Sequence, residues 1–464
     1  MKFKVKVKQF LEGLEPAFAV STKGIRRDYA LATLVTLIAD KNRLHALADG
    51  GRMTISNEIS NLTYDDLNYE CAKSGTCTVR TSELKATLSS FSLSDEIYVE
   101  VRKYREDKAA DPADATAGKS DDAADSGNEL VFTLSNDAEQ FQTVPCLRDN
   151  IRVPQQVSDF METQKPDDAF QIRRDIFVYA ANKVLFARGF EEHREKYMYW
   201  LIRADKSNVR FAAGSGARFA ILDIDGKDIT NVGQHRDLLI PNEQSAPLID
   251  IIAKAEYNNQ IVHFYISKGH LIIDCASFRA AINSYEADIV WPDENQFLDR
   301  ENVLTFTTKV GDWSNVVRGI SATFNDEMKK QHDFHYATLD IVFAKKEIAA
   351  KTEGLMKSNR KVPILSTKID TELEKEGHLV ISCVSQYLAE AVKHAAEDEF
   401  IQIEMGDAKI PIGRPILVRY HADSTGSIGD PKTFRRTNEV FGIGERFAVF
   451  FSPKKKKAAA GDAN

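Results

Sequence analysis

A chain of 464 residues is long enough for about two to four domains with separate cores, and its 43% hydrophobic and 28% charged residues are typical of globular proteins. No apolar stretch reaches the roughly 18 residues of a membrane span, and no Cys-x-x-Cys pair among the five cysteines suggests a zinc ribbon or a disulfide framework. A net charge of −8 excludes a protein that grips DNA with its whole surface, but it allows one whose basic residues face a single place.

The chain opens with MKFKVKVKQFLEGL, in which lysines alternate with Phe3, Val5 and Val7. This alternation predicts an amphipathic strand that runs into a helix, without the apolar core or cleavage site of a signal peptide. We therefore expect a cytoplasmic protein that has no membrane partner.

The same strand-then-helix pattern recurs six times along the chain, and two or three further strands follow each helix. One β-α-β-β-β unit buries little surface alone, so we expect the units to pair into three similar domains of an α+β fold. The predicted domains are residues 1–150, 168–295 and 302–453, and the six copies begin at Lys2, Cys77, Ala169, Asp237, Asn302 and Gly377.

Two segments have little to bury. Residues 106–129, EDKAADPADATAGKSDDAADSGNE, predict a disordered acidic insertion within a hairpin of the first domain. Residues 454–464 form a basic tail whose lysines favour a solvated segment over a DNA contact.

The segment VRFAAGSGARFAI, residues 209–221, sets two glycines beside Arg218 and invites a nucleotide-binding interpretation. It lacks the Lys-Ser/Thr of a P-loop, and the residues after its glycines predict a strand instead of a helix. A hairpin between two strands is the better interpretation.

Two further motifs suggest metals only weakly. DIDGKD, residues 223–228, resembles the start of a calcium loop, but its glycine comes one place early and no glutamate follows at the required distance, so Asp225-Gly226 predicts a tight turn. His332 and His335 could chelate a metal, but no cysteine, second histidine pair or carboxylate cluster lies nearby in the sequence, so a polar loop before a strand is the better interpretation. We therefore expect no metal, no cofactor and no catalytic residue.

The helices carry basic residues on the side away from their apolar faces, interleaved with acidic residues such as Glu83, Asp175, Asp250 and Glu390. Charge alone leaves two alternatives open, a solvated face and a nucleic-acid surface. Six helices, each on a sheet, favour a curved array with the helices on one side.

Taken together, these segments resemble the bacterial-type DNA polymerase sliding clamp, the beta subunit of the replicative polymerase. The resemblance rests on the opening strand and helix, on ALATLVTLIADKNRLHALADGGRMTISNEI, on the stretch from Phe170 to Ile224, and on the count of three domains. The family's segment Thr-Asp-Gly-His-Arg-Leu-Ala corresponds to residues 214–220, where Gly216, Arg218 and Ala220 match and the Asp and His are lost.

The resemblance implies a head-to-tail homodimer closed into a ring, with helices lining a hole around duplex DNA and sheets outside. Such a clamp is not an enzyme. Its partners would be the replicative DNA polymerase, the clamp loader, and repair and other polymerases that carry a clamp-binding peptide.

Two sets of site residues follow. The resemblance places Arg26 and Arg27 of GIRR, and residues of EEHREKYMY, next to DNA, and the helix-face cations join them. The full DNA-binding set is Arg26, Arg27, Lys85, Lys183, Arg188, Arg194, Lys196, Tyr197, Lys254, Lys309, Arg318 and Lys393.

The family also binds partner peptides, with Gln and Leu/Phe anchors, in a groove between its second and third domains. For Ile289 and Val290, a simple core role is the alternative. The family's usual ending, Met-Pro-Met-Arg-Leu, is replaced here by FAVFFSPKKKK. The groove set is Tyr199, Gly216, Arg218, Phe219, Ile289, Val290, Ile412, Val449, Phe450 and Phe451.

A DNA-encircling processivity clamp is therefore the function that the sequence favours. The alternative is a clamp-like scaffold or regulator that binds proteins and does not encircle DNA. An enzyme is the least favoured of the three.

Overall fold

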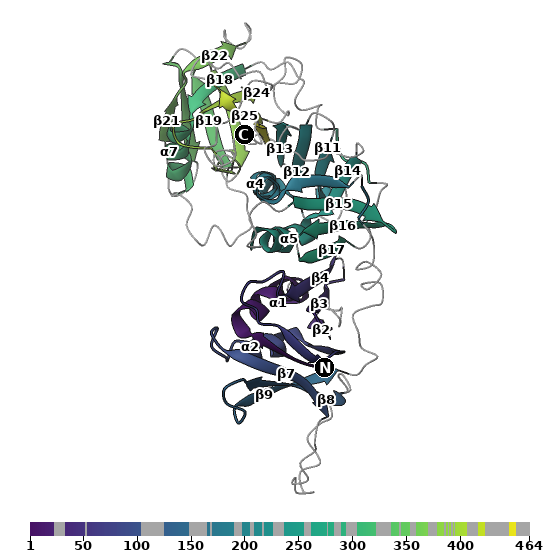
Figure 1. Ribbon diagram of the computed structural model, residues 1–464. Coiled ribbons are helices and arrows are strands. Elements are labelled where there is room, and N and C mark those ends of the chain that lie inside the picture. The colour runs from purple at the N-terminus through teal and green to yellow at the C-terminus, as the bar shows by residue number, and fades with distance from the viewer. Residues whose placement is uncertain are drawn as a thin grey trace, which may run out of the picture. The chain divides into compact units, whose positions relative to one another are not determined.

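The computed structural model describes the chain over residues 1–22, 33–51, 53–103, 125–147, 165–167, 169–189, 197–204, 208–215, 218–225, 236–254, 261–275, 277–282, 289–293, 304–321, 336–342, 345–352, 359–369, 378–384, 387, 389–390, 393, 395–405, 416–422 and 445–451 (Figure 1). Its contacts form two units. Unit 1 consists of Met1–Asp175 and Glu243–Ala287, and unit 2 of Ile176–Asn242 and Asp288–Asn464.

Each of the six predicted repeats begins with a strand that runs into helical residues, which confirms the predicted α+β fold class. In the sixth repeat the helical residues described are Tyr387 and residues 389–390. The strand-to-helix pairs are β1 (Lys2–Lys6) with α1 (Val7–Thr22), β6 (Gly75–Arg80) with α2 (Thr81–Leu88), β10 (Phe170–Arg173) with α4 (Arg174–Val184) and the 3₁₀ turn η2 (Leu185–Ala187), β14 (Arg236–Pro241) with α5 (Asn242–Lys254), β18 (Leu304–Lys309) with α7 (Val310–Ser321), and β23 (His378–Val384).

The remaining strands follow these helices and pair antiparallel. The turn between β15 and β16 is the one expected from Lys268-Gly269, whose φ angles of 50° and 78° suit a tight hairpin. These strands are β2 (Leu34–Ala39), β3 (Arg43–Asp49), β4 (Met53–Ser60), β5 (Glu70–Lys73), β7 (Glu96–Lys103), β8 (Asp125–Leu134), β9 (Phe141–Leu147), β11 (Tyr199–Ala204), β12 (Asn208–Gly214), β13 (Arg218–Asp225), β15 (Ile261–Ser267), β16 (His270–Cys275), β17 (Phe278–Ile282), β19 (Tyr336–Val342), β20 (Glu347–Thr352), β21 (Asn359–Pro363), β22 (Ser366–Ile369), β24 (Phe400–Met405), β25 (Ile416–Ala422) and β26 (Glu445–Phe451).

The end of the predicted acidic insertion belongs to a strand. β8 begins at Asp125, and Glu129 pairs with Arg102 of β7 and with Pro145 of β9. The composition predicts disorder up to residue 129, and this prediction is wrong for residues 125–129, because backbone pairing with β7 and β9 orders them. The rest of the insertion lies outside the described residues, as does the basic tail.

Each unit contains two sheets. Unit 1 holds a five-stranded sheet, β5-β1-β7-β8-β9, and an eight-stranded sheet, β10-β15-β16-β17-β4-β3-β2-β6. Unit 2 holds a nine-stranded sheet, β14-β11-β12-β13-β26-β25-β24-β18-β22, and a four-stranded sheet, β21-β20-β19-β23. The larger sheets therefore combine strands from different predicted domains, through the pairs β17–β4 and β13–β26.

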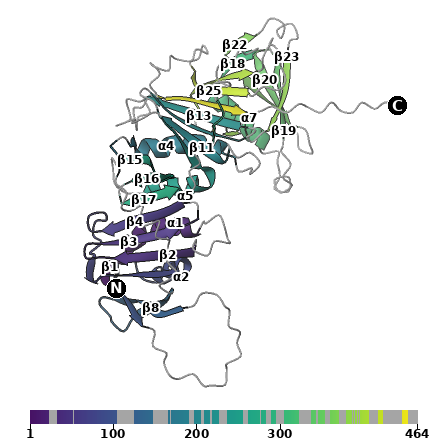
Figure 2. The ribbon, with the colours of Figure 1, turned by 90° about the vertical axis from the view of Figure 1, so that its right-hand side faces the viewer.

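The core of unit 1 forms where α1 packs on β3 and β4, beside α2 (Figure 2). Phe3 and Phe10 are buried and meet edge to face, with ring centroids 5.9 Å apart. Gly13 lets the helix approach β4, because a Cβ there would lie 2.6 Å from Cγ1 of Ile59. The Asn57 side-chain amide, buried in β4, donates to the Gly13 carbonyl at 2.7 Å. This bond ties the helix to the sheet.

The core of unit 2 is built around an aromatic group beneath α4. Phe177 of the helix packs against Trp200 of β11 and Phe211 of β12, with ring centroids 6.0 and 6.5 Å away, and those two rings stack on each other. All three side chains are fully buried, so α4 is fixed on the sheet that carries β12 and β13.

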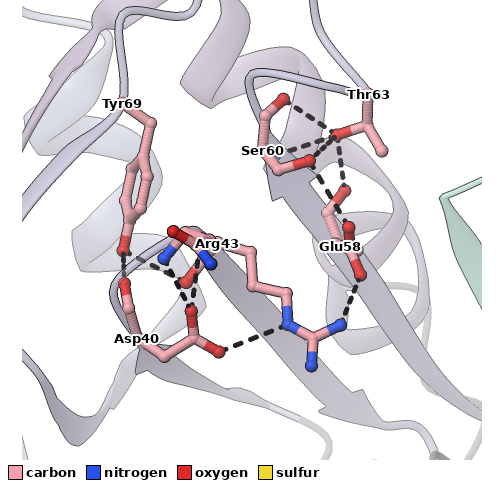
Figure 3. Close-up of polar contacts among 7 residues, drawn as sticks. Asp40, Arg43, Glu58, Ser60, Thr63 and Tyr69 are labelled. Carbon is pink, nitrogen blue, oxygen red and sulfur yellow. Dashed lines mark hydrogen bonds and ion pairs between the residues drawn. The ribbon is translucent and has the colours of Figure 1, made fainter.

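A polar cluster closes the turn between β2 and β3 (Figure 3). The Asp40 carboxylate accepts hydrogen bonds from the backbone N–H groups of Asn42 and Arg43, and the Arg43 guanidinium bonds Asp40 and Glu58. Burial would raise the pKa of Asp40, but these bonds outweigh it and lower that pKa. The Tyr69 hydroxyl donates to the Asp40 carbonyl at 2.8 Å. The cluster fixes the hairpin and accounts for its polar residues.

Candidate functional site

The GSG segment connects two antiparallel strands, as predicted. β12 ends at Gly214 and β13 begins at Arg218, and the Ser215 N–H donates to the Arg218 carbonyl at 2.8 Å. Gly214 stands opposite Phe219, and a Cβ on Gly214 would lie 2.3 Å from Cδ2 of that ring. A glycine is needed at 214 to leave room for an aromatic ring, since no side chain fits at that separation.

Phe219 contributes the buried apolar part of the site. It is 5% exposed, and its ring centroid lies 5.7 Å from that of Trp291, which is 6% exposed. The neighbouring Val290 is 84% exposed, while Ile289 is half-buried. Among the described residues, no acceptor lies within hydrogen-bond distance of the buried Trp291 Nε1. An exposed valine thus adjoins a buried indole donor.

Arg218 is held by an acidic residue from a segment far along the chain. Its Nη1 lies 2.5 Å from Oε2 of Glu390, and the two side chains are only 20% and 16% exposed. The guanidinium also lies over the Tyr387 ring, 5.4 Å from its centroid. Tyr387 and Glu390 are three residues apart, so one helical turn presents both to Arg218. We call Arg218, Phe219, Trp291, Tyr387 and Glu390 the Arg218 cluster.

Arg188 and Tyr197, two residues of the predicted DNA-binding set, belong to unit 2 together with this cluster. The pKa of Arg188 is lowered mainly by burial and, to a smaller extent, by the positive charge of Arg218. Asn242, at the start of α5, donates its side-chain amide to the carbonyls of Gly189 and Tyr197, both at 2.7 Å. Asn242 thereby fixes the two described ends of the segment that contains Arg194 and Lys196, which themselves lie outside the described residues.

The last strand brings three predicted groove residues to the same place. In the β13–β26 ladder, Val449, Phe450 and Phe451 stand opposite Ala220, Phe219 and Arg218. Tyr199 lies further away, opposite Pro241 at the start of β11, two strands from β13. Gly216 and Ile412 lie outside the described residues.

The helix-face cations differ in what they contact. Lys254 of α5 pairs with Glu15 of α1 at 2.8 Å, and this hydrogen bond, with the charge of Glu15, raises the pKa of Lys254. Arg318 of α7 lies 3.2 Å from Glu397. The Lys85 ammonium lies 5.9 Å from the centroid of the Phe18 ring.

Three more lysines of the predicted DNA-binding set span the range from buried to exposed. Lys183 of α4 is only 7% exposed, and its ammonium lies over the Tyr179 ring. Lys309, at the end of β18, and Lys393 are exposed. Arg26 and Arg27 lie outside the described residues.

Charges of both signs share every described helix. Each of α1, α2, α4, α5 and α7 carries at least one carboxylate together with its lysine or arginine. The helices therefore present a balanced surface, with the basic residues at Lys254 and Arg318 already engaged by carboxylates.

Three members of the Arg218 cluster were not among the predicted groove residues. Tyr387 and Glu390 belong to the sixth repeat, where Glu390 was interpreted only as an acidic helix-face residue. Their spacing of three was the available signal, because it puts them on one side of a helix. Trp291 follows the two residues that were predicted, but nothing in the sequence sets it apart.

The described residues contain neither a metal-ligand cluster nor a membrane-spanning helix. In the ranges that the structure describes, no three His, Cys, Asp or Glu side chains gather as metal ligands would. No described helix is long and apolar enough to cross a membrane. The two histidines of 332–335 and residues 226–228 of the DIDGKD turn lie outside those ranges.

Comparison with solved structures identifies the fold. The sliding clamp of Bacillus subtilis has a TM-score of 0.71 at 12% identity, covering 98% of this chain and 99% of that one. The DNA polymerase beta subunit of Streptococcus pyogenes gives 0.69 at 13%, and the sliding clamp of Caulobacter crescentus 0.68 at 14%, each covering 98% of this chain and 100% of its own. No family model and no curated protein sequence matches. The predicted resemblance is confirmed at the level of the fold.

Proposed function

The chain has the fold of the bacterial DNA polymerase sliding clamps, and we propose that it acts as one. It is a non-enzymatic processivity factor, built from three similar domains, 1–150, 168–295 and 302–453, that encircles duplex DNA as a head-to-tail dimer in the bacterial cytoplasm. It needs no cofactor and no metal. The observation that carries the proposal is the match over nearly the whole chain to clamps whose sequences differ almost everywhere.

The repeat supplies a rule for how such a ring closes. The fourth strand of a domain's first half, β4 or β13, pairs with the fourth strand of the next domain's second half, β17 or β26. Two strands of this series remain. β21 is the fourth strand of the third domain's first half and β9 is the fourth strand of the first domain's second half, and both stand at sheet edges in the described structure. A second copy of the chain is the partner that pairs β21 with β9.

The duplex is held loosely. Because carboxylates offset the helix cations, the contacts are few, sequence-independent and directed to phosphates, which lets the ring slide. Exposed lysines near the helices, Lys309 and Lys393, are the strongest candidates among the described residues.

Replacing Lys309 or Lys393 with Gln should lower the salt dependence of binding to a labelled duplex, because each lost phosphate contact removes about 0.9 from the slope of log K against log salt. Lys183→Gln is the matched control, since that ammonium is buried over Tyr179 and should leave the slope unchanged. Anisotropy titrations across a salt series measure the slopes. Equal slopes in all three variants would remove both lysines from the DNA-binding set.

The partner proteins are the replicative polymerase, the clamp loader and other polymerases, which share one peptide-binding surface at the Arg218 cluster and β26. Supporting this are the exposed Val290, the buried aromatic pair behind it and the pairing of Phe450 with Phe219. The test is binding of synthetic peptides with Gln, Leu and Phe anchors.

The topological part has its own test. Protein assembled on nicked circular plasmid should co-elute with it on gel filtration at a salt concentration that abolishes binding to short linear duplex. Cutting the plasmid once should release the protein, because a ring slides off a free end. Retention that does not depend on circularity would contradict encirclement, and a complete lack of retention would favour the protein-binding scaffold.

A further inference from the structure

The proposed peptide surface contains Arg218, whose positive charge is paired with a carboxylate of the same chain. A partly buried guanidinium beside an apolar surface is a strong binding group for a carboxylate. At Arg218, however, Glu390 occupies that role at 2.5 Å, and both side chains are at most one-fifth exposed. The Tyr387 ring covers part of the same guanidinium. The chain thus neutralises its own arginine at the place where a partner would meet it.

A buried indole adjoins the same surface. The Trp291 Nε1 group is buried and has no acceptor among the described residues, although a buried indole N–H usually has one. Trp291 contacts Phe219 and directly follows the exposed Val290. Apart from Arg218 and Glu390, the surface therefore consists of apolar and aromatic side chains, which suit an uncharged partner segment.

We propose that Glu390 determines the specificity of this surface, by withholding Arg218 from acidic side chains so that the site selects uncharged, apolar partner segments. This inference rests on the proposed peptide-binding role. A partner carboxylate would have to share one guanidinium with Glu390, and two like charges on one cation repel. An asparagine or glutamine in the same position meets no such repulsion.

The test uses paired peptides. Each peptide carries the Gln, Leu and Phe anchors, and the remaining positions are replaced one at a time by either Asn or Asp. The ratio of the two dissociation constants then measures the effect of a negative charge at that position. Wild-type protein should favour Asn at the position nearest Arg218. In Glu390→Gln the ratio at that position should move about tenfold toward Asp, because a charge-assisted bond to Arg218 replaces the repulsion.

Two control variants separate this mechanism from general effects. The double variant Glu390→Gln with Arg218→Gln should lose the gain, because the gain requires the guanidinium. Asp237→Asn removes the carboxylate from a similar pair in the same sheet, Arg203–Asp237 at 2.7 Å, and should change no ratio. Circular dichroism melts check that each variant is folded.

The outcomes are distinct. A wild-type preference for Asp, or an unchanged ratio at every position in Glu390→Gln, would overturn the specificity role while leaving peptide binding intact. If the folded wild-type protein binds no peptide of the series, the proposed peptide-binding role itself fails, and the inference fails with it.

Discussion

Phe141→Asp is expected to convert the proposed dimer into monomers. Phe141 begins β9, the sheet edge that we propose joins β21 of a second copy, and it is 61% exposed. Burying a large aromatic side chain at an interface contributes about 2–4 kcal/mol when it is a hot spot. A two-chain ring contains the interface twice, so the dissociation constant should rise by about a thousandfold or more. Analytical ultracentrifugation measures it.

The same sheet supplies the control. Tyr98 of β7 is 40% exposed and lies in the same cross-strand row as Phe141, with Thr133 of β8 between them. Tyr98→Asp adds the same charge at an interior strand and should leave the dimer intact. The Phe141→Asp protein should also leave circular plasmid as fast as linear duplex. A dimer that tolerates Phe141→Asp but not Tyr98→Asp would contradict closure through β9.

Gly214→Ala should both destabilise unit 2 and weaken peptide binding. Its new Cβ would lie 2.3 and 2.4 Å from two atoms of Phe219, so the ring must shift, and its contact with Trp291 is disturbed. Overpacking of this kind costs about 1–3 kcal/mol, measurable by urea denaturation. Displacing Phe219 removes the apolar surface behind Val290, so peptide affinity should fall at least about tenfold.

Gly269→Ala separates the two effects. Gly269 has a φ of 78° in the β15–β16 turn of unit 1, and a Cβ there would meet nothing within 4 Å. Backbone strain alone should cost about 1 kcal/mol. This variant should lose stability yet bind peptides normally. If Gly214→Ala also binds normally, Phe219 does not belong to the peptide site.

The fold could be predicted largely because short sequence patterns indicate its strands and helices. Alternation at Phe3, Val5 and Val7 marks a strand wherever it occurs, and six copies of one pattern reinforce each other. The hairpin at Gly214 could be recognised because no helix follows its glycines. The strand at residues 125–129 could not, because its acidic residues are ordered by partners in β7 and β9.

The candidate site was harder to predict because its contacts are distant in sequence. Arg218 and Glu390 are 172 residues apart. Glu15 and Lys254 are separated by 239 residues, so a lysine predicted as a cation for DNA proves to have a carboxylate partner. Ion pairs between residues so far apart in sequence depend on which strands and helices become neighbours in the fold. A single sequence contains no pattern that predicts those neighbours.

The two merged sheets have a mechanical consequence. The ladder between β17 and β4 pairs five positions, and that between β13 and β26 pairs seven. The backbone hydrogen bonds of such a ladder share an applied force and resist bending together. The covalent chain also connects the two sides of each of these ladders. In a closed ring the contact between two chains lacks this covalent reinforcement. If the proposed ring forms, a force that opens it should therefore separate the two chains at that contact before it breaks either merged sheet.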